Sequence, residues 1–252
     1  MTAMEAAMQQ PGESAGLSQV ERVVDTFVAP TKTFTDILRD ASWWLPFLLS
    51  ILVSLAFVTS IDRQIGFEQV AQTNINRNAQ AQQRMSGLTD AQRQQQIHTI
   101  ANVTRVISYV YPVLGVIFAL ICAGILMMSF NFGLGAKASY KEYLAVWFYA
   151  GLPYLIKFLL AAIAIFAGVS AEQFDINNPV GTNVGWYLTS DVPLWVRTLF
   201  SSADIFTLWA IVLLILGCSI VARVKRSSAA IVIIGWWVLI ILAGTIMAAV
   251  QG

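Results

Sequence analysis

Residues 205–250 read IFTLWAIVLLILGCSIVARVKRSSAAIVIIGWWVLIILAGTIMAAV, two apolar runs separated by a short basic turn. The first run covers Ile205 to Ala222 and the second covers Ala229 to Val250. A bilayer core about 30 Å thick is crossed by about 20 apolar residues in a helix, so each run predicts a membrane span. Neither run alternates as barrel strands do, and a helix then satisfies the backbone within hydrocarbon.

Three apolar runs upstream have the same character. They cover Trp43 to Ile61, Ser108 to Phe130 and Tyr143 to Gly168, and Pro153 interrupts the last of them. Charged residues make up 12% of the chain, about half the share expected of a soluble domain, so most of the chain has lipid as its solvent. The sequence therefore predicts an all-α polytopic membrane protein, a helical bundle of about five transmembrane helices within residues 43–250.

Basic residues near the ends of the runs predict the orientation. With a cytoplasmic N-terminus, the inner side collects Arg22, Lys32, Arg39, Lys137, Lys141, Arg223, Lys225 and Arg226. The outer side then holds arginines only, several of them deep in a long loop where they have little weight. We therefore expect a cytoplasmic N-terminus and an external C-terminus.

The segment before the first span predicts two parts. Residues 1–16 have few large apolar side chains, and we expect a disordered cytoplasmic tail. Residues 17–42 predict cytoplasmic amphipathic helices, the first of which begins with a capping box formed by Ser18 and Glu21. One face of this helix carries Val20, Val23, Val24 and Phe27. These helices either lie on the cytoplasmic leaflet or dock on the inner face of the bundle.

Two long connections are expected on the outer side. Residues 62–107 predict a helical hairpin, because Thr89 and Gln92 form a second capping box and the arm from Asp90 continues into the second span. The alternative for this Gln- and Asn-rich segment is low-complexity disorder. Residues 169–204 predict a loop that follows the outer membrane surface, since their amphipathic aromatic residues favour the boundary with water.

Nothing in the sequence has the pattern of a catalytic or cofactor site. His98 is the single histidine, so neither a histidine metal cluster nor a Ser-His-Asp triad can form. The phosphate-binding GxxxxGK[ST] and dinucleotide-binding GxGxxG motifs are missing. A net charge of +1 gives no field that would recruit nucleic acid. We expect no catalytic residue, cofactor, metal or nucleic-acid partner.

Lys157 is the one clear charge inside an apolar run. It lies about 11 residues from Gly168, which places its backbone roughly 16 Å deep, near the bilayer midplane. A charged lysine there costs about 3 kcal/mol, so we expect it to face the bundle. Pro153 frees a nearby backbone carbonyl, and Asp62 and Asp204 are candidate counter-ions at the outer ends of two spans. Lys157 either serves a solute or partner site, or only holds helices together or extends toward water.

Small residues form a stripe on the second span. Gly115, Ala119 and Ala123 recur every four residues, a spacing that lets helices approach closely. The stripe either packs within the bundle or forms the seam of a homo-oligomer.

A series of motifs occurs along the chain. Pro30-Thr31-Lys32-Thr33-Phe34 is followed by Trp43, Trp44 and Pro46. Later come Gly133-Leu134-Gly135, Ser139-Tyr140-Lys141, Tyr149-Ala150-Gly151-Leu152-Pro153 and Asp204-Ile205-Phe206-Thr207-Leu208-Trp209. From Pro30 to Val250 the order of these motifs resembles the Yip (Ypt-interacting protein) family, in particular its bacterial branch.

The resemblance implies a five-span membrane protein with a cytoplasmic N-terminus and no enzymatic activity. Eukaryotic relatives bind small prenylated GTPases, while some bacterial relatives accompany ABC-type efflux systems. This sequence lacks the Asp-Leu-Tyr-Gly-Pro signature of the eukaryotic pattern before the first span and has a longer first outer loop. Both departures argue against GTPase binding.

We therefore expect a non-enzymatic scaffold or accessory subunit of the bacterial inner (cytoplasmic) membrane. Its partners would be membrane lipids and another membrane protein, with an ABC transporter as one candidate. An alternative is a small transporter or channel that uses the broken third span. A third is a trafficking adaptor that binds a small GTPase.

Overall fold

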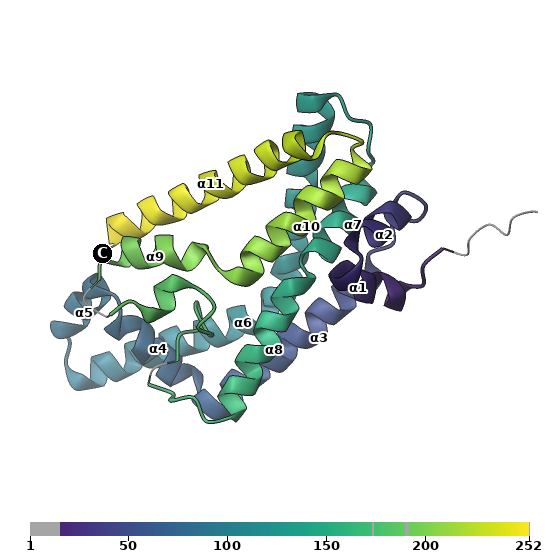
Figure 1. Ribbon diagram of the computed structural model, residues 1–252. Coiled ribbons are helices and arrows are strands. Elements are labelled where there is room, and N and C mark those ends of the chain that lie inside the picture. Colours follow the sequence, from purple (N-terminus) through teal and green to yellow (C-terminus); the bar gives the residue numbers. More distant parts are fainter. Residues whose placement is uncertain (1–15, 173, 190–191, 252) are drawn as a thin grey trace, which may run out of the picture.

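The computed structural model describes residues 16–172, 174–189 and 192–251 (Figure 1). Within these ranges all regular structure is helical. Four segments are long and apolar enough to cross a membrane: Trp44–Ile65, Asp90–Phe132, Tyr140–Phe166 and Arg226–Val250. A bent pair of helices, α9 (Leu194–Ser202) and α10 (Ile205–Val221), makes a fifth if it is counted as one span. The predicted all-α membrane protein is therefore confirmed, with four to five candidate spans.

Two of the spans end in π-helical turns, and one is made of two helices. The first span is α3 (Trp44–Ser60) with η1 (Ile61–Ile65), and the second is α6 (Asp90–Met127) with η2 (Met128–Phe132). The third joins α7 (Tyr140–Ala150) to α8 (Leu152–Phe166), and the last is α11 (Arg226–Gln251).

The third span is interrupted beside Pro153, as the sequence predicts, because α7 ends at Ala150 and α8 begins at Leu152. Pro153 lies in the first turn of α8, where its missing N–H needs no helical partner. The chain turns only briefly at Gly151, and α7 and α8 together form one candidate span of 27 residues. The sharp bend is in the fourth span instead, where α9 and α10 meet at 48°.

The two ends of the bundle carry different elements (Figure 1). We call one the basic end; it carries α1, α2, the connection 133–139 and the turn 222–225. Ala138 and Val224, from that connection and that turn, belong to one apolar cluster. The opposite, hairpin end carries α4, α5 and the C-terminus, where Gln80 Nε2 donates a hydrogen bond to the Val250 carbonyl.

The helices before the first span dock on the protein itself. These are α1 (Gln19–Val28) and α2 (Pro30–Ile37); residues 1–15 of the predicted tail lie outside the described residues. The capping box of Ser18 and Glu21 is confirmed. The apolar stripe predicted on α1 is divided, because Val23 and Phe27 pack against the bundle while Val20 and Val24 are exposed.

A close contact at Gly217 fixes α2 on the bundle. The Phe34 ring of α2 is fully buried between α7 and α10. A Cβ atom added to Gly217 would lie 2.6 Å from Val146 Cγ1 and 2.9 Å from the Phe34 ring, distances that side chains do not tolerate without a shift. The lack of a side chain at Gly217 therefore lets Phe34 of α2 pack against α7 and α10.

The helical hairpin predicted for residues 62–107 is present as α4 (Phe67–Asn76), α5 (Ala79–Ser86) and the first part of α6. The capping box of Thr89 and Gln92 starts α6, which continues without interruption for 38 residues. The buried side chains that join α4 to α6 are Val70, Ala71, Ile75, Ile97 and Ala101. An apolar interface of this kind favours ordered helices over low-complexity disorder.

We predict that Gly217→Ala destabilises the protein by about 1–3 kcal/mol, because the new methyl group overpacks the contact between α2 and α10. The matched control is Gly235→Ala on α11, where an added Cβ meets no atom within 4 Å. Thermal unfolding in detergent measures both variants. Equal midpoints for the two would contradict the close packing at Gly217.

Candidate functional site

Lys157 and Asp204 form an ion pair between two spans. Lys157 projects from α8, and its Nζ donates to Asp204 Oδ2 at 3.0 Å. The side chains are 14% and 2% exposed, so the pair is held almost entirely within the protein. Asp204 is fixed in place because it caps α10, with Oδ1 accepting a hydrogen bond from the Phe206 N–H at 2.9 Å.

The connection before α9 supplies further donors to the same carboxylate. The Thr182 hydroxyl and Asn183 Nδ2 both donate to Asp204 Oδ2. Asn183 is held by a reciprocal pair of hydrogen bonds with Asn178, at 2.7 and 3.1 Å. Asn178 also donates to Ser201 Oγ at 3.4 Å. Together these side chains, with Lys157 and Asp204, form a buried polar network.

This network changes the interpretation of residues 169–204. The sequence predicts a loop that follows the outer membrane surface, and the structure adds that Asn178, Asn183 and Phe174 of this segment are buried within the protein. The turn η3 (Val184–Tyr187) packs so closely on α9 that a Cβ at Gly185 would lie 2.9 Å from the Arg197 carbonyl oxygen. Polar side chains from the loop thereby reach an otherwise apolar interior and satisfy the carboxylate there.

Asp62 does not reach Lys157, so its proposed role as a second counter-ion is wrong. It lies in η1, where Oδ2 accepts hydrogen bonds from Arg105 Nη2 at 2.8 Å and from the Tyr109 hydroxyl at 3.0 Å. Both partners project from α6. Arg105 is more exposed than Lys157. Pairing Asp62 with Arg105 therefore costs less desolvation than pairing it with Lys157 would.

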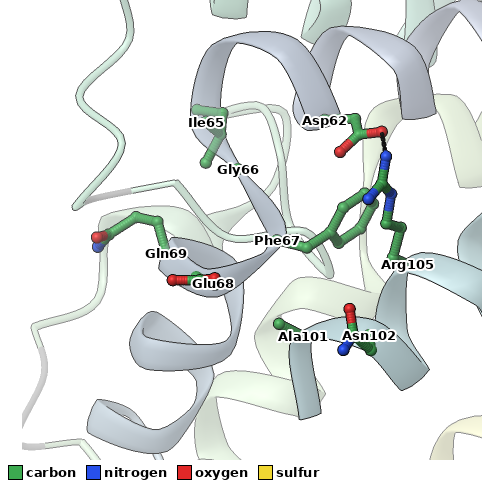
Figure 2. Close-up of a pocket in the computed structure, with 9 residues that line it drawn as sticks. All are labelled: Asp62, Ile65, Gly66, Phe67, Glu68, Gln69, Ala101, Asn102 and Arg105. Atoms are coloured by element: carbon green, nitrogen blue, oxygen red, sulfur yellow. Dashed lines mark hydrogen bonds and ion pairs between the residues drawn. The ribbon is translucent and has the colours of Figure 1, made fainter. Parts of the chain in front are cut away.

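The Asp62–Arg105 pair borders a polar cleft of about 460 Å³ at the hairpin end (Figure 2). Phe67 and Glu68 from the start of α4, and Ala101 and Asn102 from α6, complete its walls. Gly66 has a positive φ of 82°, which turns the chain sharply from η1 into α4. The cleft is thus built where two helical segments separate.

The small-residue stripe of the second span is only partly used inside the molecule. Ala119 and Ala123 are buried in the apolar cluster that α6 shares with α7. Gly115 has no atom within 4 Å of an added Cβ. Two of the three positions therefore serve packing within the bundle.

A further buried charge, Arg22 of α1, was not predicted from the sequence as a site residue. Its side chain is fully buried, with Nε donating to Asp36 Oδ2 at 2.6 Å and Nη1 donating to the Asp40 carbonyl at 2.8 Å. The Thr26 and Thr33 hydroxyls donate to the Arg22 carbonyl. A threonine one turn after an arginine on an apolar helix face was the available signal.

Asp36 carries the charge that compensates Arg22. Burial raises the pKa of Asp36. Hydrogen bonds from Arg39 and Arg22 lower it by a larger amount, so the pKa of Asp36 lies below the usual aspartate value. A carboxyl group whose pKa is depressed by folding stabilises the fold above its unfolded pKa. That contribution is lost as the pH falls through the folded pKa.

We predict a coupling free energy of about 1–3 kcal/mol between Lys157 and Asp204 in a double-mutant cycle. Lys157→Met should lower stability, because it leaves a buried carboxylate without its counter-ion. Asp204→Asn keeps the helix cap, and adding it to Lys157→Met should cost less than the two single effects combined. Denaturant unfolding in detergent measures all four proteins, and strictly additive effects would argue against the ion pair.

We predict that Asp36→Asn loosens α1 and α2, because Arg22 then stays buried beside a neutral amide. Trypsin should cleave after Lys32 and Arg39 several-fold faster than in the wild type, while Asp25→Asn serves as control because Asp25 makes no ion pair in the described residues. The same loosening should appear in the wild type only at acid pH, below the usual range of aspartate. Unchanged cleavage in Asp36→Asn would refute the anchoring role.

The Yip1 domain family matches residues 24–247 of the chain. No curated protein and no solved structure matches. The matched residues include α2, the polar network around Asp204 and most of every candidate span. The family consists of generally non-enzymatic membrane proteins. The match covers well over half of the chain, and the protein therefore belongs to the Yip1 domain family of multi-pass membrane proteins.

Proposed function

We propose that this protein is a non-enzymatic scaffold that binds another membrane protein in a bacterial inner membrane. The observation that carries the proposal is the poor coverage of α11. Only 6% of the apolar stretch of this span is buried inside the molecule, against 44% for the third span. A span that its own chain covers so little has a free surface for a helix of a partner.

The packing of α11 shows which part of it is free. Its contacts within the molecule are mainly with α9 and α10. Large apolar side chains along the rest of the helix are exposed, among them Ile231, Leu239 and Ile246. Near η2, the residues Val232, Gly235 and Leu239 line an apolar crevice of about 270 Å³ that accommodates side chains of another helix.

The transmembrane subunit of an ABC-type exporter is our first candidate for the partner. The resemblance to bacterial relatives that accompany such systems supports this choice. In the proposed orientation the basic end, with α1 and α2, faces the cytoplasm, as the positive-inside rule expects. The hairpin end would then contact envelope-side parts of the complex.

A transporter or channel is the second candidate, supported by the intramembrane pair of Lys157 and Asp204 beside the bend of the fourth span. Against it, the carboxylate is fully occupied by donors from the protein. Purified protein in sealed vesicles separates the two proposals. Solute flux by the protein alone would favour transport and reject the scaffold.

We predict that a photo-crosslinking residue at Leu239 or Ile246 yields one discrete adduct with a membrane protein, identified by mass spectrometry. The control position is Ile233 on the same helix, which is buried and should yield none. Co-purification in mild detergent should recover the same partner. Lipid adducts alone at both exposed positions would contradict a protein partner on α11.

A further inference from the structure

Five cations lie at the basic end, on the connection before α7 and on the turn between α10 and α11 (Figure 1). Lys137 and Lys141 flank the start of α7, and Arg223, Lys225 and Arg226 form the turn between α10 and α11. We call these five residues the basic patch. All five side chains are exposed, and none of them makes an ion pair or hydrogen bond with a described residue.

Several arginines toward the hairpin end, in contrast, have acceptors within the protein. Arg105 pairs with Asp62, and Arg77 pairs with Asp175. Arg197 donates to the Thr189 carbonyl at 2.6 Å. The protein therefore supplies internal acceptors for several cations at one end and leaves the whole basic patch at the other without any.

The one acidic residue within 133–142 does not neutralise the basic patch. Glu142 accepts hydrogen bonds from the N–H and hydroxyl of Ser139, as part of the capping box that starts α7. The turn 222–226 contains no acidic residue. The positive charge of the basic patch is consequently open to an external anion.

Exposed apolar side chains beside the cations indicate the depth of the basic patch in the bilayer. Phe132 is 83% exposed, and Met128 and Leu134 are also exposed. These residues come directly before Lys137, so the chain passes from lipid-seeking to cationic side chains within a few residues. This order places the cations at the level of the lipid headgroups.

The backbone at Arg223 gives an independent indication that its charge matters. Among the described residues, Arg223 is the one non-glycine residue with a positive φ, at 54°. It ends α10 in a Schellman motif, with hydrogen bonds from Arg223 N–H to the Ile220 carbonyl and from Val224 N–H to the Ser219 carbonyl. Glycine is strongly favoured at this position, so the arginine side chain is present despite a conformational cost.

Lys225 and Arg226 lie where their charges oppose the helix dipole. They precede and begin α11, whose N-terminus carries partial positive charge. Cations at this end of a helix are unfavourable on their own, whereas a bound phosphate is favourable there. A bound anion would therefore stabilise this turn, whose cations are unfavourable in its absence.

We propose that the basic patch binds the phosphodiester headgroups of anionic phospholipids in the adjacent leaflet. Arg223, Lys225 and Arg226 hold the headgroup at the start of α11. Lys137 and Lys141 add charge from the neighbouring connection, and Phe132 with Leu134 inserts beside the acyl chains. This inference does not depend on the scaffold proposal, because it is argued from the exposed cations and not from the apolar face of α11.

The test uses the full chain purified in a neutral detergent, with dioleoyl phosphatidylglycerol and dioleoyl phosphatidylcholine as probes. Native mass spectrometry counts the retained lipids. The wild type should retain phosphatidylglycerol in preference, and Lys225→Gln combined with Arg226→Gln should lower its affinity by about tenfold. The matched control is Arg63→Gln with Arg84→Gln, two exposed arginines toward the hairpin end, which should change little.

Several results would overturn the proposal. These are equal retention of the two lipids by the wild type, or equal losses in the two double variants. Displacement by soluble glycerol phosphate at the same affinity would show a free-anion site instead of a lipid site. A preference for polyglutamate over phosphatidylglycerol would assign the basic patch to an acidic protein partner.

Arg223→Gly separates a binding role from a structural role. Glycine relieves the positive φ, so thermal stability in detergent should rise, while retention of phosphatidylglycerol should fall. Opposite changes in the two measurements support the proposal. A fall in stability, or an unchanged affinity for the lipid, would mean that Arg223 serves only the turn.

Discussion

The ion pair of Lys157 and Asp204 holds two spans and a connecting loop in one arrangement. A lysine within a span needs a counter-ion, and the carboxylate that supplies it also caps α10. Because Asp204 must be buried to reach Lys157, the loop before α9 has to bring Thr182 and Asn183 inward as further donors. The bend of the fourth span follows from the same requirement, since α10 begins at the capping carboxylate rather than continuing from α9.

The same rule governs the other aspartates that join elements. Asp36 compensates Arg22 and fixes α1 to α2, and Asp62 compensates Arg105 and fixes η1 to α6. In each case the carboxylate forms an ion pair with a cation of a different helix. Charge compensation therefore also sets the relative position of the two helices. The basic patch is the contrasting region, because there no carboxylate of the described residues pairs with the cations.

The sequence predicts the spans well because the length of an apolar run is a local property. The capping boxes at Ser18 and Thr89 are local as well, and both are present. Partners of charged side chains are not local. Asp62 and Asp204 both lie at span ends, and only the packing of α6 beside η1 shows that Asp62 belongs to Arg105. The interruption beside Pro153 is local too, since a proline in the first turn of α8 suits the start of a new helix.

The docking of α1 and α2 on the bundle affects the order in which parts of the protein fold during synthesis. Residues of α1 and α2 leave the ribosome before the spans, so their binding surface on the bundle is made later. Phe34 packs against Val146 and Gly217, and Gln19 accepts a hydrogen bond from the Tyr149 hydroxyl. The N-terminal helices therefore dock only after the third and fourth spans have been inserted. A chain truncated before Gly217 would leave Phe34 without part of its binding surface, and exposed apolar side chains of this kind are what chaperones and proteases recognise in an unfinished protein.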